Sequence, residues 1–227
     1  MNSDNNGTGK HICVYSSSSD MVAPEYFAVA RELGAAIAQR GHTLVFGGTN
    51  VGLMGACAKA AHQGGGKVIG IIPSFIADRG LAFEKADELI VTSDMRRRKA
   101  IMEERADAFV ALPGGFGTLD EMFEILTLAQ THKLAKKITV VVYGTEYWKR
   151  VFNFDALVDT GAISPKDIEL FQYADTSEQA FELLRAGLTE NYLIPEANAA
   201  AEQAFHELLP TSTFEDFLGP EWAKTTS

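Results

Sequence analysis

The residues with the clearest chemical potential lie in one central stretch, residues 112–121, which reads Leu-Pro-Gly-Gly-Phe-Gly-Thr-Leu-Asp-Glu. Its glycines, Gly114, Gly115 and Gly117, allow the backbone to approach a bound group closely. A short apolar run precedes the stretch, and Leu119 opens an apolar pattern of helical spacing. Free N–H groups at the start of such a helix attract an anion. We therefore expect this strand, turn and helix to bind a phosphate group.

The same stretch has a second interpretation, which the spacing favours equally. Thr118 and Glu121 are three residues apart before an apolar run. This is the pattern of a capping box, in which the two side chains satisfy backbone donors at the start of a helix. The two interpretations are compatible with each other.

Arg98 is the second residue whose surroundings predict chemistry. It follows Met95 by three residues and precedes Met102 by four, so it shares a helix face with apolar side chains. An arginine on such a face requires a partner, and phosphate or carboxylate is the usual one. A purely structural salt bridge, for example to Glu121, is the alternative.

The elements that position these residues alternate between apolar strands and helical patterns. We expect strands at residues 12–15, 43–46, 67–72, 88–91, 108–112 and 138–143. Helices are expected from Pro24 to Gly41, from Gly52, around Tyr147 and Trp148, and around residues 181–188. Another helix is expected to begin at Met95, with Ser93 or Asp94 as its cap. This alternation predicts an α/β fold with a doubly wound parallel sheet of the Rossmann-like type.

Two further loops follow predicted strands and are candidates for ligand contacts. Residues 16–19 are four serines, whose hydroxyl groups are suited to phosphate or ribose unless they form a plain polar loop. Gly47 and Gly48 precede the Gly52-Leu-Met-Gly helix start. This is neither a dinucleotide fingerprint nor a Gly-Lys-Ser/Thr phosphate loop, so we expect a mononucleotide bound without magnesium. Pro73 is expected to stop the strand at residues 67–72. Residues 74–86 are expected to be irregular and to lie over a pocket, with residues 75–83 lining the base.

Composition limits the partners and the compartment. The formal net charge of −10 argues against nucleic acid or an anionic membrane as the main partner. No run is long enough to span a bilayer and no signal peptide is visible, so a cytoplasmic location is expected. Cys13 and Cys57 are expected to be buried and free, and no His or Cys pattern indicates a metal site.

The 227 residues predict a single domain between two extensions. We expect a disordered tail at residues 1–10, the nucleotide-binding domain at residues 11–190 and a helical extension at residues 191–227. The extension carries an amphipathic stripe of Ala197, Ala201, Ala204, Phe205, Leu208 and Leu209. This stripe either packs on its own domain or forms a subunit interface.

Three ordered motifs together resemble the LOG ("lonely guy") family of Rossmann-fold nucleotide-binding proteins. Residues 113–121 reproduce its Pro-Gly-Gly-x-Gly-Thr-x-x-Glu signature, residues 95–99 its Met-x-x-Arg-Lys motif, and residues 47–55 its glycine-rich turn. The resemblance covers residues 10–187. It implies hydrolysis of the N-glycosidic bond of nucleoside 5′-monophosphates, including AMP and cytokinin riboside monophosphates, to a free base and ribose 5-phosphate.

The resemblance also implies roles for individual residues. Glu121 and Arg98 are the expected catalytic pair, because a carboxylate near the anomeric carbon stabilises the positive charge that develops on the ribose ring. The expected substrate-binding residues are Lys99, Gly114, Gly115, Gly117, Thr118, Gly48, Ser17, Ser18 and Met95. No cofactor is expected, and the family suggests a homodimer or a higher assembly.

Some positions depart from the family pattern. Ser16 and Ser17 replace a Cys-Gly pair, and Leu128, Thr131, His132 and Lys137 replace residues of the plant-like branch. The chain is more similar to the longer bacterial branch, and the preferred base stays open. The alternative function is a nucleotide or cofactor carrier without turnover. A pyridoxal-dependent decarboxylase would need a marked cofactor lysine, and no segment provides one.

Overall fold

A computed structural model of the chain describes residues 9–131, 133–134 and 137–193. The chain divides into two compact units, Met1–Thr189 and Glu190–Ser227. The fold described below is that of the first unit. Residues 1–8 of the predicted tail, His132, and the amphipathic stripe at residues 197–209 lie outside the described residues.

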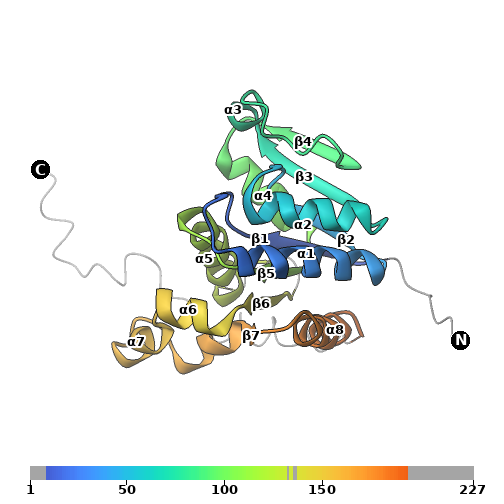
Figure 1. Ribbon diagram of the computed structural model, residues 1–227. Coiled ribbons are helices and arrows are strands. Elements are labelled where there is room, and N and C mark those ends of the chain that lie inside the picture. Colours follow the sequence, from blue (N-terminus) through green and yellow to red (C-terminus); the bar gives the residue numbers. More distant parts are fainter. Residues whose placement is uncertain (1–8, 132, 135–136, 194–227) are drawn as a thin grey trace, which may run out of the picture. The chain divides into compact units, whose positions relative to one another are not determined.

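Seven parallel strands form one sheet in the order β4-β3-β2-β1-β5-β6-β7 (Figure 1). They are β1 (His11–Tyr15), β2 (Thr43–Phe46), β3 (Val68–Pro73), β4 (Glu88–Thr92), β5 (Ala108–Ala111), β6 (Thr139–Tyr143) and β7 (Gln172–Ala174). This confirms the predicted doubly wound parallel sheet. The strand order reverses between β1 and β5, and open α/β sheets bind ligands in the crevice at such a switch point.

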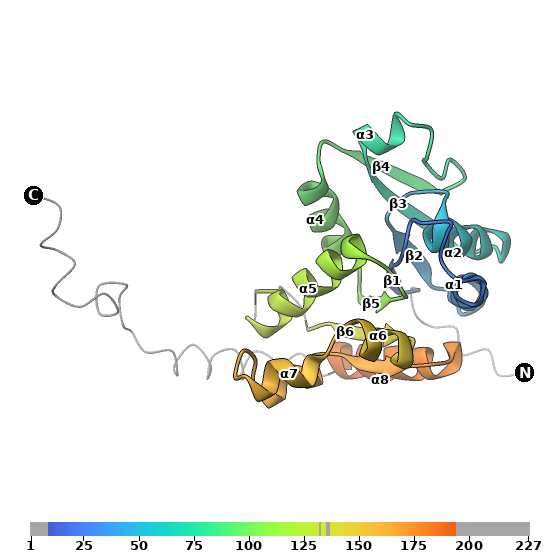
Figure 2. The ribbon, with the colours of Figure 1, turned by 60° about the vertical axis from the view of Figure 1, so that its left-hand side comes forward.

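Helices cover both faces of the sheet (Figure 2). The core on one face contains side chains of α1 (Pro24–Gln39), α2 (Gly52–Gln63) and α8 (Ser177–Leu193). The core on the other face contains side chains of α4 (Met95–Arg105), α5 (Phe116–Gln130), α6 (Thr145–Val151) and α7 (Phe154–Asp159). The layer formed by α4 and α5 carries the motif residues Arg98 and Glu121.

Strand alternation explains how one sheet supplies two cores. In β1, Ile12 and Val14 pack into one core, whereas Cys13 and Tyr15 pack into the other. Parallel strands that are covered on both faces require apolar residues at every position, which is why these strands are continuous apolar runs. Cys13 and Cys57 are buried and free, as predicted. Burial raises the pKa of the Cys57 thiol to about 12.

The structure corrects several local predictions. Pro73 is the last residue of β3 and does not stop the strand before it, and the segment predicted to be irregular contains the short helix α3 (Ser74–Ala77). Sequence reasoning missed α7, β7 and the 3₁₀ helix Pro165–Leu170. These elements have only three to six residues each, which is too short for a hydrophobic period to become visible.

Across the described ranges, no helix combines the length and apolar character that crossing a bilayer would require.

Candidate functional site

The motif residues gather where β1 and β5 end, at the switch point of the sheet. Two backbone hydrogen bonds join the strand ends there. Leu112 N–H donates to the Tyr15 carbonyl at 2.9 Å, and Ser17 N–H donates to the Pro113 carbonyl at 3.3 Å. The serine loop after β1 and the glycine loop after β5 are therefore held side by side.

The glycines of the second loop serve two different purposes. A Cβ atom on Gly114 would lie 2.0 Å from Oγ1 of Thr118, so the buried Thr118 side chain requires a glycine there. A Cβ atom on Gly115 or Gly117 would meet nothing within 4 Å. No atom of the described residues requires glycine at these two exposed positions, and the missing side chains leave room for a ligand to approach the backbone.

The capping-box interpretation of Thr118 and Glu121 is wrong. Helix α5 begins at Phe116 with Gly115 as its N-cap and no side-chain cap. Leu119 N–H makes the first helical hydrogen bond, to the Gly115 carbonyl at 3.0 Å. The helix starts three residues earlier than a Thr118 cap would need. The first N–H groups of a helix have no partner within it, so those of α5 are available to an anion.

Arg98 and Glu121 form a buried ion pair. Nη1 of Arg98 lies 2.6 Å from Oε1 of Glu121, and the two residues are only 4% and 3% exposed. Nε of Arg98 donates to the Ile71 carbonyl at the end of β3, at 3.1 Å. A Cβ atom on Gly47 would lie 1.9 Å from Nη2 of Arg98. The glycine after β2 therefore makes room for the guanidinium group.

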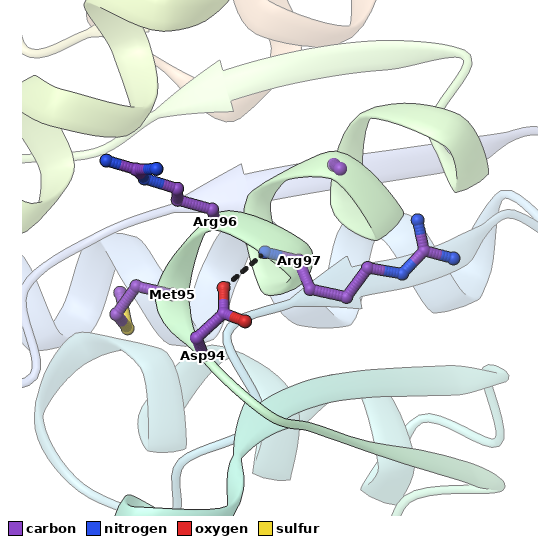
Figure 3. Close-up of a pocket in the computed structure, with 5 residues that line it drawn as sticks. Asp94, Met95, Arg96 and Arg97 are labelled. Atoms are coloured by element: carbon purple, nitrogen blue, oxygen red, sulfur yellow. Dashed lines mark hydrogen bonds between the residues drawn. The ribbon is translucent and has the colours of Figure 1, made fainter.

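Of the two predicted caps of α4, Ser93 and Asp94, the structure shows Asp94. Its Oδ1 accepts a hydrogen bond from Arg97 N–H at 2.9 Å, which Figure 3 shows as a dashed line. Arg96 and Arg97 are exposed and point apart in Figure 3. Arg98, in contrast, is buried. This cap fixes where the helix starts and hence which arginine reaches the sheet. Met95 lines an open hollow of about 750 Å³ at this end of the helix, with Asp94, Arg96, Arg97 and Ala100.

The carboxyl group of Glu121 is unusual in its pKa and in its hydrogen bonding. Burial raises the pKa of Glu121, and the ion pair with Arg98 opposes that rise without cancelling it. Its second oxygen, Oε2, is buried and has no hydrogen-bond partner among the residues that the structure describes. Burying such an atom without a partner is costly. Arg98 thus holds one carboxylate oxygen and leaves the other available to a ligand or a water molecule.

Ser16 is a candidate that sequence reasoning did not single out. It directly follows β1 and is 1% exposed, and its Oγ atom is buried without a partner. The sequence pointed to Ser16 only as one of the four serines at residues 16–19, whose hydroxyl groups are suited to phosphate or ribose. Ser16 Oγ and Glu121 Oε2 are the two buried side-chain atoms without a partner within the described part of the chain.

The predicted residues Ser17 and Ser18 lie against the start of α2. The Ser17 carbonyl accepts from Leu53 N–H at 2.9 Å, and a Cβ atom on Gly52 would lie 2.4 Å from the Ser18 carbonyl carbon. The Ser17 hydroxyl accepts from Ser19 N–H at 3.1 Å. The serine loop is thus packed onto α2, and the Ser18 side chain stays exposed.

Gly48 and Lys99 lie around the ion pair. Gly48 has a φ of +76°, which favours glycine, and its carbonyl accepts from Phe83 N–H at 2.9 Å. Phe83 packs on Phe46 in the core and does not line an open site.

Lys99 Nζ binds two carboxylates of α5 that sequence reasoning did not consider, those of Asp120 and Glu124.

The arrangement can stabilise charge of both signs. The N-terminus of α5 and the exposed glycines suit a phosphate, and the Glu121 carboxylate suits a developing cation or an attacking water. Within residues 9–131, 133–134 and 137–193, no group of three His, Cys, Asp or Glu residues is arranged to hold a metal ion.

The chain is similar to known proteins in sequence and in fold. The family model described as "Possible lysine decarboxylase" matches residues 54–184. A cytokinin riboside 5′-monophosphate phosphoribohydrolase from Mycobacterium tuberculosis is 44% identical over 74% of this chain and 90% of its own length. The cytokinin riboside 5′-monophosphate phosphoribohydrolase LOG7 from Arabidopsis thaliana is 41% identical over 69% of this chain and 72% of its own length. Among solved structures, the molybdenum cofactor carrier protein of Chlamydomonas reinhardtii has a TM-score of 0.61 and 26% identity, over 80% of this chain and 99% of its own.

Proposed function

Because this chain belongs to the LOG family of cytokinin riboside 5′-monophosphate phosphoribohydrolases, we propose that its site hydrolyses nucleoside 5′-monophosphates. The bond broken is the N-glycosidic bond, and the products are a free base and ribose 5-phosphate. AMP and cytokinin riboside 5′-monophosphates are the candidate substrates. The chain is an enzyme of the N-glycosyl hydrolase class.

The observation that carries this proposal is the state of the Glu121 carboxylate. It is buried, its Oε1 is held by Arg98 and its Oε2 has no partner. Cleavage of an N-glycosidic bond builds positive charge on the ribose ring. A fixed carboxylate stabilises that charge and can also remove a proton from the attacking water. Its unpaired oxygen suits either contact.

The other residues bind the substrate and position the carboxylate. The first N–H groups of α5, with Gly115 and Gly117 around them, would bind the 5′-phosphate. Thr118 packs on Gly114 and shapes this loop. The Ser16 hydroxyl, buried without a partner at the switch point, suits a hydroxyl or phosphate oxygen of the ligand. Ser17, Ser18, Gly48 and Met95 form the surrounding loops and the adjacent hollow.

We further propose that the enzyme is cytoplasmic and homo-oligomeric, with a dimer as the smallest assembly. Phe116 in the glycine loop and Met21 in the loop before α1 are each 92% exposed. Covering these two apolar side chains in a subunit interface would remove apolar surface from water and would favour association. The residue 1–10 tail and the residue 191–227 extension remain predictions about the ends of this domain.

A carrier that binds a phosphorylated ligand without turnover is the competing function. The likeness to the molybdenum cofactor carrier supports it at the level of the fold. A carrier has no need of a buried carboxylate with a free oxygen. The relatives with 41–44% identity carry an enzyme name, which favours hydrolysis.

Base release distinguishes the two functions. Purified protein is incubated with a panel of nucleoside 5′-monophosphates and with the matching nucleosides, and free base is measured by chromatography. We expect release from monophosphates and none from nucleosides, because the phosphate supplies the binding energy. A folded protein that binds a monophosphate and releases no base from any of them would indicate the carrier.

A further inference from the structure

Two consecutive cations on α4 each bind carboxylates of α5. Arg98 binds Glu121, and Lys99 places its Nζ atom 2.9 Å from an oxygen of Asp120 and 2.8 Å from an oxygen of Glu124. Asp120 and Glu124 are four residues apart and share one face of α5. Figure 2 shows that the two helices are neighbours. The Glu121 carboxylate therefore lies next to a second set of ion pairs, which Lys99 forms with Asp120 and Glu124.

We propose that Lys99 is a positioning residue and not a ligand of the substrate. It fixes α4 against α5 and thereby holds the Arg98 guanidinium group on Glu121. This inference rests on the proposed hydrolysis, because it gives Lys99 a role in that reaction. It replaces the substrate contact that the sequence motif suggests.

The surroundings of Lys99 support this role. Its side chain is 15% exposed and its ammonium group contacts two carboxylates, which balance its charge and take up most of its hydrogen-bond donors. Burial alone would lower the pKa of Lys99, but hydrogen bonds to Glu124 and Asp120 raise it above its ordinary value. The lysine is thus charged and anchored.

Two other polar contacts of α4 lead away from α5. Asp94 caps its first turn, and Arg105 in its last turn binds Glu88 of β4 at 2.9 Å. Apolar side chains of α4 and α5 share one core, and the ion pairs of Arg98 and Lys99 add polar contacts that join the two helices. A shift of about 1 Å in a catalytic group is enough to reduce turnover about a hundredfold.

Steady-state kinetics of base release by purified full-length variants tests the proposal. Lys99→Met should lower kcat about 10- to 100-fold and change KM less than about twofold. Lys99→Arg should restore most of kcat, since arginine can bridge the same two carboxylates. The double variant Asp120→Asn/Glu124→Gln should reproduce the loss, although it leaves Lys99 in place.

A substrate ligand would behave in the opposite way. Lys99→Met would then raise KM, and freeing the ammonium group in Asp120→Asn/Glu124→Gln would leave kcat intact. That pair of results would overturn the proposal. Arg105→Met is the matched control, because it breaks an ion pair of the same helix away from Glu121. It should leave kcat unchanged, and an equal loss of kcat there would also contradict a specific role for Lys99.

A second measurement requires no turnover. The pKa of Glu121 can be followed from its side-chain carboxyl carbon by NMR in the wild type and in Asp120→Asn/Glu124→Gln. Asp120 raises this pKa and Arg98 lowers it. Removal of negative charge alone would therefore lower the pKa, whereas loss of the Arg98 contact would raise it. A rise supports the proposal, and a fall or no change overturns it. A wild type without base release would refute the hydrolase while this titration still decides the role of Lys99.

Discussion

The guanidinium group of Arg98 occupies the space where Gly47 has no side chain. A Cβ atom on Gly47 would lie 1.9 Å from Nη2 of Arg98 and 3.0 Å from Sδ of Met54. Both atoms lie in the outer parts of flexible side chains, so the backbone need not move to relieve the contact. The glycine of one motif thus leaves space for the arginine of another, and that arginine forms the ion pair with Glu121.

Gly47→Ala should therefore produce a folded but nearly inactive enzyme. We expect the added methyl group to displace the Arg98 side chain and to lower kcat about a hundredfold or more. Thermal unfolding should show a loss of stability of about 1–3 kcal/mol, as is usual for overpacking. Unchanged base release would mean that the position of Arg98 is not critical.

Gly114→Ala and Gly115→Ala form a matched pair with opposite expected effects. Gly114→Ala should destabilise the fold by about 1–3 kcal/mol, because the new atom meets the buried Thr118 side chain. Gly115→Ala meets open space, so its loss of stability should be limited to the weaker N-cap that alanine provides, about 1 kcal/mol or less. Its affinity for a 5′-monophosphate, measured by calorimetry, should fall instead. Unaltered affinity would place the phosphate away from this loop.

The pH dependence of kcat should report on Glu121. Burial raises its pKa above the ordinary value of 4.5, and hydrolysis requires the ionised carboxylate. The acidic limb of the profile should therefore lie above pH 4.5. An acidic limb at or below that value would show that another group, or none, controls the rate.

The same shift has a consequence for stability. The folded protein holds the Glu121 proton more tightly than the unfolded chain does. Glu121 therefore contributes stability that is complete below about pH 4.5 and is lost as the pH rises through the raised folded value. The difference in unfolding free energy between the wild type and Glu121→Gln should change across this window. A difference that is constant with pH would contradict the raised pKa.

The sequence was sufficient to predict the sheet and the ion pair for physical reasons. Each buried parallel strand is a continuous apolar run, and Arg98 on an apolar helix face requires a buried partner. Glu121 was named as that partner in the structural alternative. The structure shows the pair, and its chemical role stays a proposal.

Other features depended on tertiary contacts that the sequence does not display. The Thr118–Glu121 spacing fits a capping box, but Arg98 binds the Glu121 carboxylate and the helix starts at Phe116. The contacts of Lys99 with Asp120 and Glu124 join two helices that a strand separates along the chain. Ser16 could be singled out only once its burial was known. The short strand β7 could be recognised only from its pairing with β6.

The most direct test of the account is base release by Glu121→Gln, compared with the wild type on the same 5′-monophosphate. Glutamine preserves the size of the side chain and an oxygen for Arg98, but it removes the negative charge. We expect a folded variant that still binds the monophosphate and has a kcat at least about a hundredfold lower. A variant that releases base within a few fold of the wild-type rate would contradict the assignment of Glu121 as the catalytic carboxylate.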